Sequence, residues 1–174
     1  LNDRTWHEVG GGLWTSGGEI FALQAVPRSG GMYDLYVGGT FSEVGFTGSV
    51  VSAHNIARWD GSAWHPVGYG TSGRVYAIAI TAGGDVIVGG DFSSAGSGPA
   101  VAAENIARWN GSAWSVLGSG VGSQSFERVN ALLFDGSHLV AGGRFDLSGQ
   151  QVVNHLARWN GAAWSSMDGG LGVN

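Results

Sequence analysis

The sequence predicts an all-β fold built from repeated four-stranded antiparallel units, and three recurring features support this prediction. A tryptophan-rich segment occurs three times at a spacing of 50 residues, at 55–64, 105–114 and 155–164, as NIARWDGSAW, NIARWNGSAW and HLARWNGAAW. Upstream of each copy, an apolar run ends in a Gly-Gly-x-Phe motif, as LYVGGTF, VIVGGDF and LVAGGRF. Further upstream, a third segment aligns on a shared alanine, at Ala22, Ala77 and Ala131. Features that recur in a fixed order at this period indicate a repeat architecture.

The two upstream features predict the first two strands of each unit. The expected first strand, for example Val75 to Ile80, is rich in β-branched and apolar residues. A glycine-containing turn follows. The second strand, for example Val86 to Val88, is then apolar at successive positions. Such a run is expected when both faces of a strand are buried.

The tryptophan-rich segment predicts the last two strands. The third strand carries Ile-Ala-Arg-Trp or Leu-Ala-Arg-Trp and is followed by Asp60-Gly61, Asn110-Gly111 or Asn160-Gly161. Asx-Gly between two strand-like runs predicts a type I′ hairpin turn, in which both central residues have φ above zero. The fourth strand begins at the second tryptophan and, in the first unit, contains Pro66. Because proline is tolerated mainly on edge strands, we expect this strand at the outer rim of the unit.

Four antiparallel strands that recur at this period match the blade of a β-propeller. Helical repeats would show a period of about 3.6 residues, a parallel β-helix has much shorter coils, and an immunoglobulin-like sandwich would not repeat internally. The expected division is a fourth strand of a preceding blade plus a link at 1–20, then blades at 21–70, 71–120 and 121–174. The predicted fold is therefore about three four-stranded blades plus one extra N-terminal strand.

The extra strand is predicted from the segment TWHEVG at 5–10, which resembles AWHPVG at 63–68. The candidate assembly strand consists of Trp6, His7, Glu8 and Val9. A propeller ring has about four to eight blades, so three blades do not close alone. An open arc would also expose the apolar faces of both terminal blades. We therefore expect part of a larger propeller or an oligomeric ring with protein as the partner. A longer polypeptide is favoured over a homo-oligomer, because the chain starts in one fourth strand and stops just past another.

Composition narrows the classes of partner and the cellular location. Only 12% of the residues are charged, the net charge is −5, and all eight basic residues are scattered arginines. A nucleic-acid-binding protein would carry a basic stripe, so nucleic acid is not an expected partner. No apolar run of about 18 residues occurs, so no membrane span is expected. A surface rich in Gly, Ser, Thr and Asn suits an extracellular or cell-surface protein.

Some recurring residues have both a structural and a functional interpretation. The paired tryptophans could form a platform for sugars, but core packing between blades is favoured. Arg58, Arg108 and Arg158 could form a ring of cations, but stacking on tryptophan or pairing with a carboxylate is favoured. Trp14 lies outside the repeated positions in a Gly/Ser-rich link, so it is the candidate exposed ligand contact. The loops between second and third strands vary in length and are candidates for either function or drift.

No catalytic, cofactor-binding or metal-binding residues are predicted, so an enzyme is not expected. The chain has no cysteine, which excludes disulfides, thiolate metal sites and a cysteine nucleophile. Its five histidines do not cluster, and neither HExxH nor Gly-x-Ser-x-Gly occurs. The glycine runs lack the helix that a phosphate loop requires. Asn110-Gly111-Ser112 fits a glycosylation acceptor and equally a plain hairpin turn, and both interpretations remain open.

The Gly-Gly motif followed by a tryptophan-bearing hairpin resembles a divergent kelch repeat. The pattern YVGG-F … N-IARW-G-W-LG resembles a second group of repeats more closely than it resembles the kelch repeat. These repeats occur in large secreted or surface proteins of bacteria and, in similar form, in fungal cell-surface proteins. This resemblance implies an exported, modular protein with an adhesive or structural role. The copper chemistry of the kelch-like galactose oxidases needs a Cys–Tyr cross-link, which this chain lacks. The expected function is a non-enzymatic extracellular structural or protein-interaction module. The alternative is a carbohydrate-binding, lectin-like propeller.

Overall fold

The protein is all-β and forms three four-stranded antiparallel sheets. The computed structural model describes residues 7–12, 18–46, 48–122 and 126–167. In these residues the one helical element is a single 3-10 turn, η1 (Ser29–Gly31). The predicted all-β class and the three four-stranded units are confirmed.

Each sheet follows chain order, so its first strand lies at one edge and its fourth strand at the other. Sheet 1 consists of β1 (Glu19–Pro27), β2 (Tyr33–Thr40), β5 (Ile56–Trp59) and β6 (Trp64–Pro66). Sheet 2 consists of β7 (Val75–Ile80), β8 (Val86–Gly90), β11 (Ile106–Trp109) and β12 (Trp114–Val116). Sheet 3 consists of β13 (Arg128–Phe134), β14 (Leu139–Arg144), β17 (Leu156–Trp159) and β18 (Trp164–Ser166). Pro66 lies in an edge strand, as predicted.

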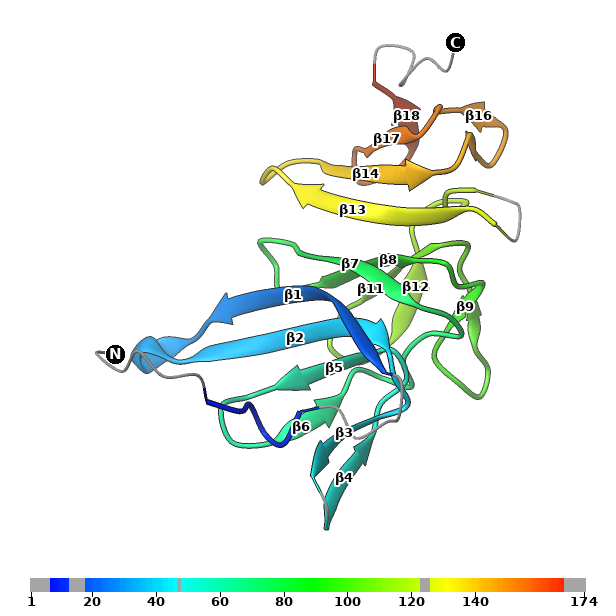
Figure 1. Ribbon diagram of the computed structural model, residues 1–174. Helices are drawn as coiled ribbons and strands as arrows, with labels where there is room; N and C mark the ends of the chain where they lie inside the picture. The colour runs from blue at the N-terminus through cyan, green and yellow to red at the C-terminus, as the bar shows by residue number, and fades with distance from the viewer. Residues whose placement is uncertain (1–6, 13–17, 47, 123–125, 168–174) are drawn as a thin grey trace.

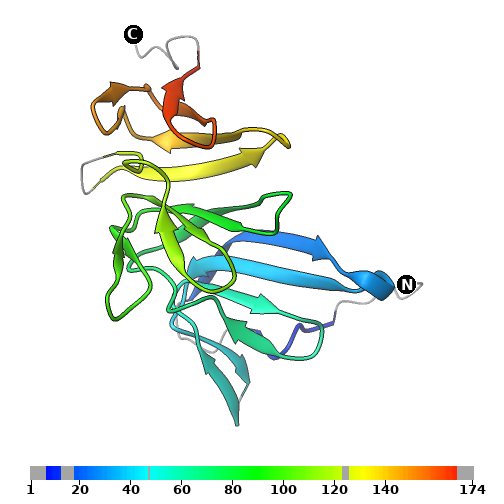
Figure 2. The same ribbon diagram turned by 180° about the vertical axis from the view of Figure 1, so that it is seen from behind.

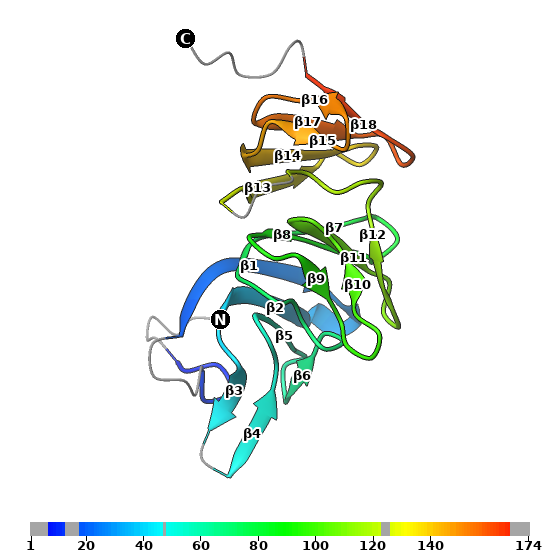
Figure 3. The same ribbon diagram turned by 90° about the vertical axis from the view of Figure 1, so that its right-hand side faces the viewer.

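Three additional hairpins lie in the variable segments between the second and third strands. They pair β3 (Glu43–Phe46) with β4 (Ser49–Ser52), β9 (Ser94–Ala95) with β10 (Val101–Ala102), and β15 (Leu147–Ser148) with β16 (Gln151–Val152). The sequence did not predict these hairpins, because strands of two to four residues are too short to show a clear alternation of apolar and polar residues. In Figure 3 the longest of them, β3–β4, projects away from the sheets.

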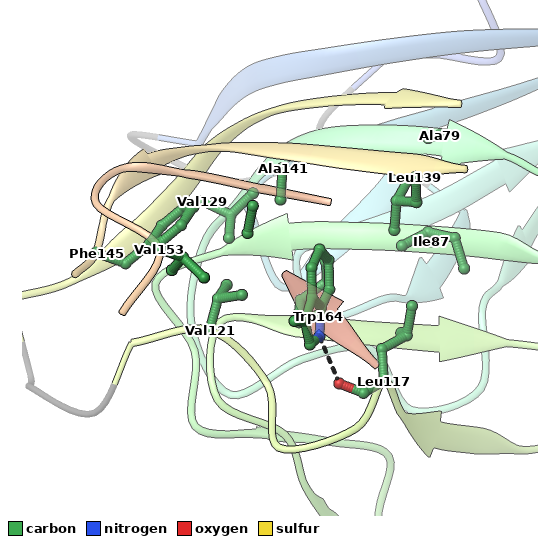
Figure 4. Close-up of a cluster of buried hydrophobic side chains, with 12 residues drawn as sticks. Ala79, Ile87, Leu117, Val121, Val129, Leu139, Ala141, Phe145, Val153 and Trp164 are labelled. Carbon is green, nitrogen blue, oxygen red and sulfur yellow. Dashed lines mark hydrogen bonds between the residues drawn. The ribbon is translucent and has the colours of Figure 1, made fainter. Parts of the chain in front are cut away.

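The three sheets stack face to face in chain order. Figure 1 shows sheet 1 in blue to teal below, sheet 2 in green between, and sheet 3 in yellow to orange above, and Figure 2 shows the same order from behind. Apolar side chains fill both contacts. Ile56, Val75 and Val88 belong to the cluster between sheets 1 and 2. The cluster between sheets 2 and 3, drawn in Figure 4, includes Ile87 and Val129. Sheet 2 is therefore covered on both faces.

Glycine is needed at the two positions of each Gly-Gly motif for different structural reasons. A Cβ atom added at Gly38 would lie 2.5 Å from Cγ1 of Val75 in the next sheet, and one at Gly89 would collide with Val129 in the same way. A Cβ atom at Gly39 would collide with the carbonyl oxygen of Glu19 in the neighbouring strand. The register of β1 and β2 shifts at this point, and the same shift recurs in the other two sheets. The first glycine therefore permits close stacking of sheets, and the second accommodates a β-bulge.

The two tryptophans of each segment differ in burial. The second of each pair, at Trp64, Trp114 and Trp164, is buried with 7–8% exposure, whereas the first is only partly buried. The indole Nε1 of Trp164 donates a hydrogen bond of 2.8 Å to the carbonyl of Leu117, at the end of the preceding sheet (Figure 4). Nε1 of Trp64 donates to the carbonyl of Gly10, in the segment before sheet 1, at 2.9 Å, whereas the buried Nε1 of Trp114 has no hydrogen-bond partner in the described structure. The favoured core interpretation holds fully for the second tryptophan of each pair.

The hairpin between the third and fourth strands is not the predicted type I′ turn. Trp59 pairs with Trp64 across the ladder, so the loop has four residues. Within it only Gly61 has a positive φ, of 96°. The Oδ1 atom of Asp60 accepts hydrogen bonds from the backbone N–H groups of Ser62 and Ala63, at 2.9 and 2.8 Å. The prediction of a two-residue turn was wrong because the Asx side chain itself supplies the acceptor that closes a longer loop.

Candidate protein-binding surfaces at the ends of the sheet stack

The outward face of sheet 1 exposes apolar side chains that are buried at the same positions in sheet 2. We call this surface the leading face and define it by Ile20 and Leu23 of β1. Aligned on the shared alanine, Ile20 matches Val75 and Leu23 matches Ile78. Ile20 is 46% exposed and Leu23 is 63% exposed, whereas Val75 is 0% and Ile78 is 8% exposed. The difference arises because sheet 1 covers Val75 and Ile78, while no described residue covers the leading face to that extent.

The outward face of sheet 3 exposes residues that are buried at the same positions in sheet 2. We call it the trailing face and define it by Leu133, Val140, Gly142 and Leu156. Leu133 is 62% exposed, and Val140 and Leu156 are partly exposed. The matching residues of sheet 2 are Ala79, Ile87, Gly89 and Ile106, all buried beneath sheet 3. A Cβ atom added at Gly142 would meet just one atom within 4 Å in the described structure, Cδ1 of Leu156 at 3.8 Å. The trailing face thus carries an open depression where sheets 1 and 2 each receive a valine.

The recurring arginines border the face that each sheet turns toward the next sheet along the chain. Arg58 pairs with Asp34 at 3.3 Å, and Arg108 pairs with Asp85 at 2.7 Å. The predicted pairing of these arginines with carboxylates is confirmed for these two. In sheet 3 the position of the carboxylate is taken by His138, whose Nε2 lies 2.7 Å from Nη2 of Arg158. The trailing face therefore has a different rim from the two faces that are covered.

One ionisable side chain, that of Tyr36, lies at the contact between sheets 1 and 2. Tyr36 of β2 packs against the apolar cluster of that contact. Burial raises the pKa of Tyr36, and the nearby Arg58 guanidinium acts in the opposite direction. The phenol therefore remains neutral in the contact. It adds aromatic area to the interface without placing a charge there.

Cavities lie beside the tryptophans at the outer side of the sheets. One, of ≈ 330 Å³, is lined by aromatic, hydroxyl and small side chains, among them Tyr69, Ser97, Trp109 and Ser112. Tyr69 is 64% exposed and stacks on His54 with ring centroids 6.0 Å apart. A related cavity of ≈ 250 Å³ lies at the matching place in sheet 3, beside Trp159. These cavities combine aromatic surface with hydrogen-bonding groups, as sites for small polar ligands do.

The residues singled out from the sequence are only partly within the described structure. Trp6 and Trp14 lie outside the described residues. His7, Glu8 and Val9 are described, and they belong to none of the strands. They lead into a turn in which the Gly12 N–H donates to the Val9 carbonyl at 3.0 Å, as the Gly70 N–H donates to the Val67 carbonyl, also at 3.0 Å. The likeness between 5–10 and 63–68 thus extends to the backbone of the turn that follows.

Other classes of site have no counterpart in the described part of the chain. It contains no group of three or more His, Cys, Asp or Glu side chains that could hold a metal ion. None of its helices has the length and apolar character needed to cross a bilayer. Comparison with models of known protein families, with curated proteins and with solved structures gives no match.

Proposed function

We propose that this chain is a non-enzymatic structural or protein-interaction module of an extracellular or cell-surface assembly, and that its three sheets are an arc of a β-propeller. The repeat, the low charge and the similarity to repeats of secreted and surface proteins support the location. The chain-order stacking of four-stranded antiparallel sheets supports the propeller.

The observation that carries the proposal is the pair of exposed end faces. Ile20 and Leu23 at one end, and Leu133 at the other, leave large apolar side chains in contact with solvent. Exposed apolar patches of this kind mark protein-binding surfaces or aggregation-prone sites. At the internal contacts the same repeat positions are buried against another sheet, so the surface is already suited to bind protein. The end faces are therefore the surfaces through which the module binds its partner.

Site-specific photo-cross-linking on cells that express the chain tests this function. A photoreactive amino acid is placed at position 23 on the leading face or at position 133 on the trailing face, with position 62 in the exposed hairpin of sheet 1 as the matched control. We expect protein adducts at positions 23 and 133 that exceed those at position 62. Equal yields at all three positions, or adducts to glycan alone, would contradict a protein-interaction role of the end faces.

Carbohydrate binding is the second candidate function, and the ≈ 330 Å³ cavity favours it. The exposed ring of Tyr69 and the partly buried Trp109 present aromatic surface, and Ser97 and Ser112 present hydroxyl groups. Sugars combine an apolar face with hydroxyl groups, so this lining suits them. Trp14 remains the contact proposed from sequence alone.

A glycan array followed by isothermal titration tests this second function. Specific binding to one class of sugar, lost in Tyr69→Ala or in Trp14→Ala, would place carbohydrate binding first. Tyr33→Ala is the matched control, because Tyr33 is also strongly exposed but does not line the cavity. Absence of binding to every glycan class would remove the carbohydrate hypothesis.

A further inference from the structure

We propose that the leading face of one copy of this chain docks head to tail on the trailing face of a second copy. The inference rests on the proposed function, because it names the partner of the end faces. It assigns Ile20 and Leu23 as the inserted side chains and Gly142 as the floor of the depression that receives them.

The two internal contacts of the stack define the geometry of such docking. At each contact a β-branched residue of one sheet lies over the first glycine of the Gly-Gly motif in the sheet before it. Val75 lies over Gly38, and Val129 lies over Gly89. A second apolar residue accompanies each valine, because Cδ1 of Ile78 also lies near Gly38 and Cδ1 of Leu132 near Gly89. The contact is therefore a pair of apolar side chains inserted into a glycine depression.

The leading face carries a third, unused copy of the inserted pair. Ile20 stands two residues before the shared alanine, as Val75 and Val129 do, and Leu23 stands one residue after it, as Ile78 and Leu132 do. The strand has the same β-bulge next to this alanine as the first strands of the other sheets. The side-chain types, spacing and backbone irregularity of the internal contacts are thus all present at this end.

The trailing face carries a third, unused copy of the depression. Gly142 occupies the position of Gly38 and Gly89, but no valine of the described chain lies over it. Leu156 takes the place of Ile56 and Ile106, which are both 0% exposed beneath the next sheet. Because Leu156 is only partly buried, a further sheet laid on the trailing face would complete its burial. The depression matches the inserted pair in chemistry and in position within the repeat.

We assign a second copy as the partner, in place of the longer polypeptide that the sequence favoured, because one chain carries both a spare inserted pair and a spare depression, at opposite ends of the stack. A contact between two different surfaces of identical chains is heterologous, and it closes into a ring when the rotation between copies allows. Two copies would supply six sheets, within the range of about four to eight that propeller rings contain. Each added contact would continue the internal contacts already formed.

Paired substitutions measured by sedimentation velocity test the inference on the full chain. Leu23→Asp places a charge in the inserted pair, and Gly142→Val fills the depression. Each variant alone should weaken self-association at least about tenfold relative to the wild type. In Leu23→Asp the contact would bury a charge without a partner, and in Gly142→Val the filled depression would exclude the inserted pair. An equimolar mixture of the two variants should restore association, since one contact between unaltered faces remains, and growth should stop at two chains.

Controls separate docking from folding. Gly142 does not have a positive φ, and a Cβ atom there meets just Leu156 Cδ1 in the described structure, so Gly142→Val should keep the fold. Phe46→Asp is the matched charge control, because Phe46 is 55% exposed, comparable to the 63% of Leu23, but belongs to the β3–β4 hairpin, which projects away from the sheets (Figure 3). It should associate like the wild type, and far-ultraviolet circular dichroism should be unchanged in all variants.

The possible outcomes distinguish the inference from the proposed function. Restored association in the mixture supports head-to-tail docking. Association that Leu23→Asp abolishes but Gly142→Val leaves intact would mean that leading faces pair with each other, which overturns the inference and leaves a protein-binding end face. A wild-type chain that stays monomeric at about 100 μM would also overturn the inference. The cross-linking yields at positions 23 and 133 would still decide the proposed function.

Discussion

Asp60, Asn110 and Asn160 occupy the same corner of the three sheets. In each, the side-chain Oδ1 accepts two backbone hydrogen bonds that close the four-residue loop between the third and fourth strands. Asp60 differs because it is ionisable and because its Oδ2 lies 2.7 Å from Nε2 of His65. The hydrogen bond from the Ala63 backbone, with further ones from His65 and Ser62, holds the pKa of the Asp60 carboxyl well below its usual range. One loop of the three is therefore sensitive to acid.

Asp60→Asn should reduce the loss of thermal stability in acid. A carboxyl whose pKa is lowered on folding stabilises the protein above its ordinary pKa of 3.8, and this contribution is lost as the pH falls below that value. Asparagine keeps the Oδ1 acceptor, as the other two sheets demonstrate, but does not titrate. The fall in Tm between pH 6 and about pH 2.5 should be smaller in the variant than in the wild type. An equal fall in both would contradict this role of Asp60.

At the scale of elements, the Gly-Gly strands determine how closely neighbouring sheets approach. The same glycine has a different environment depending on where its sheet stands in the stack. Gly89 lies beneath Val129 of sheet 3, whereas Gly142 faces an open depression. The same type of strand therefore forms a buried contact in sheet 2 and an exposed surface in sheet 3. Single substitutions at Gly89 and Gly142 can distinguish these two environments.

Gly89→Ala should destabilise the protein, and Gly142→Ala should not. A Cβ atom at Gly89 would overlap the buried side chain of Val129, and overpacking of this kind costs about 1–3 kcal/mol. A Cβ atom at Gly142 lies at ordinary contact distance from Leu156, so the change should stay within about 0.5 kcal/mol. Urea unfolding of both variants at equal protein concentration measures the free energies of unfolding. Equal losses would mean that the two glycines have equivalent surroundings.

The repeat pattern predicted the recurring strands. It did not predict the burial of side chains that depends on how neighbouring sheets pack. The four strands of each unit, the edge position of Pro66 and the pairing of Arg58 and Arg108 with carboxylates followed from the sequence. The unequal burial of Trp109 and Trp114 did not, although both side chains lie against Gly68 in the turn of the preceding sheet. Ile20 and Leu23 resemble core residues in sequence, and only the position of sheet 1 at the end of the stack makes them exposed.

At the scale of the whole molecule, the extensive contacts between sheets in the described part of the chain all join neighbours, so the stack resembles a one-dimensional array. Sheet 2 has two such contacts, and all five residues of its β8 strand are buried. Sheets 1 and 3 each have one internal contact and one end face. Local opening of sheet 2 must break two contacts, whereas opening of an end sheet breaks one.

This difference predicts a gradient of amide hydrogen exchange along the stack. In the Gly142→Val variant, where docking between copies is blocked, amides in β8 should exchange more slowly than those in β2 and β14, by about tenfold or more, because the free energy of opening rises with each contact broken. In the wild type at concentrations that favour association, β2 and β14 should gain protection, since each end sheet then has a second contact. Exchange measured by mass spectrometry at low and high protein concentration resolves the three sheets. Uniform protection in the variant would refute the nearest-neighbour picture. A wild-type pattern that does not change with concentration would place the stabilising partner of the end faces outside this chain.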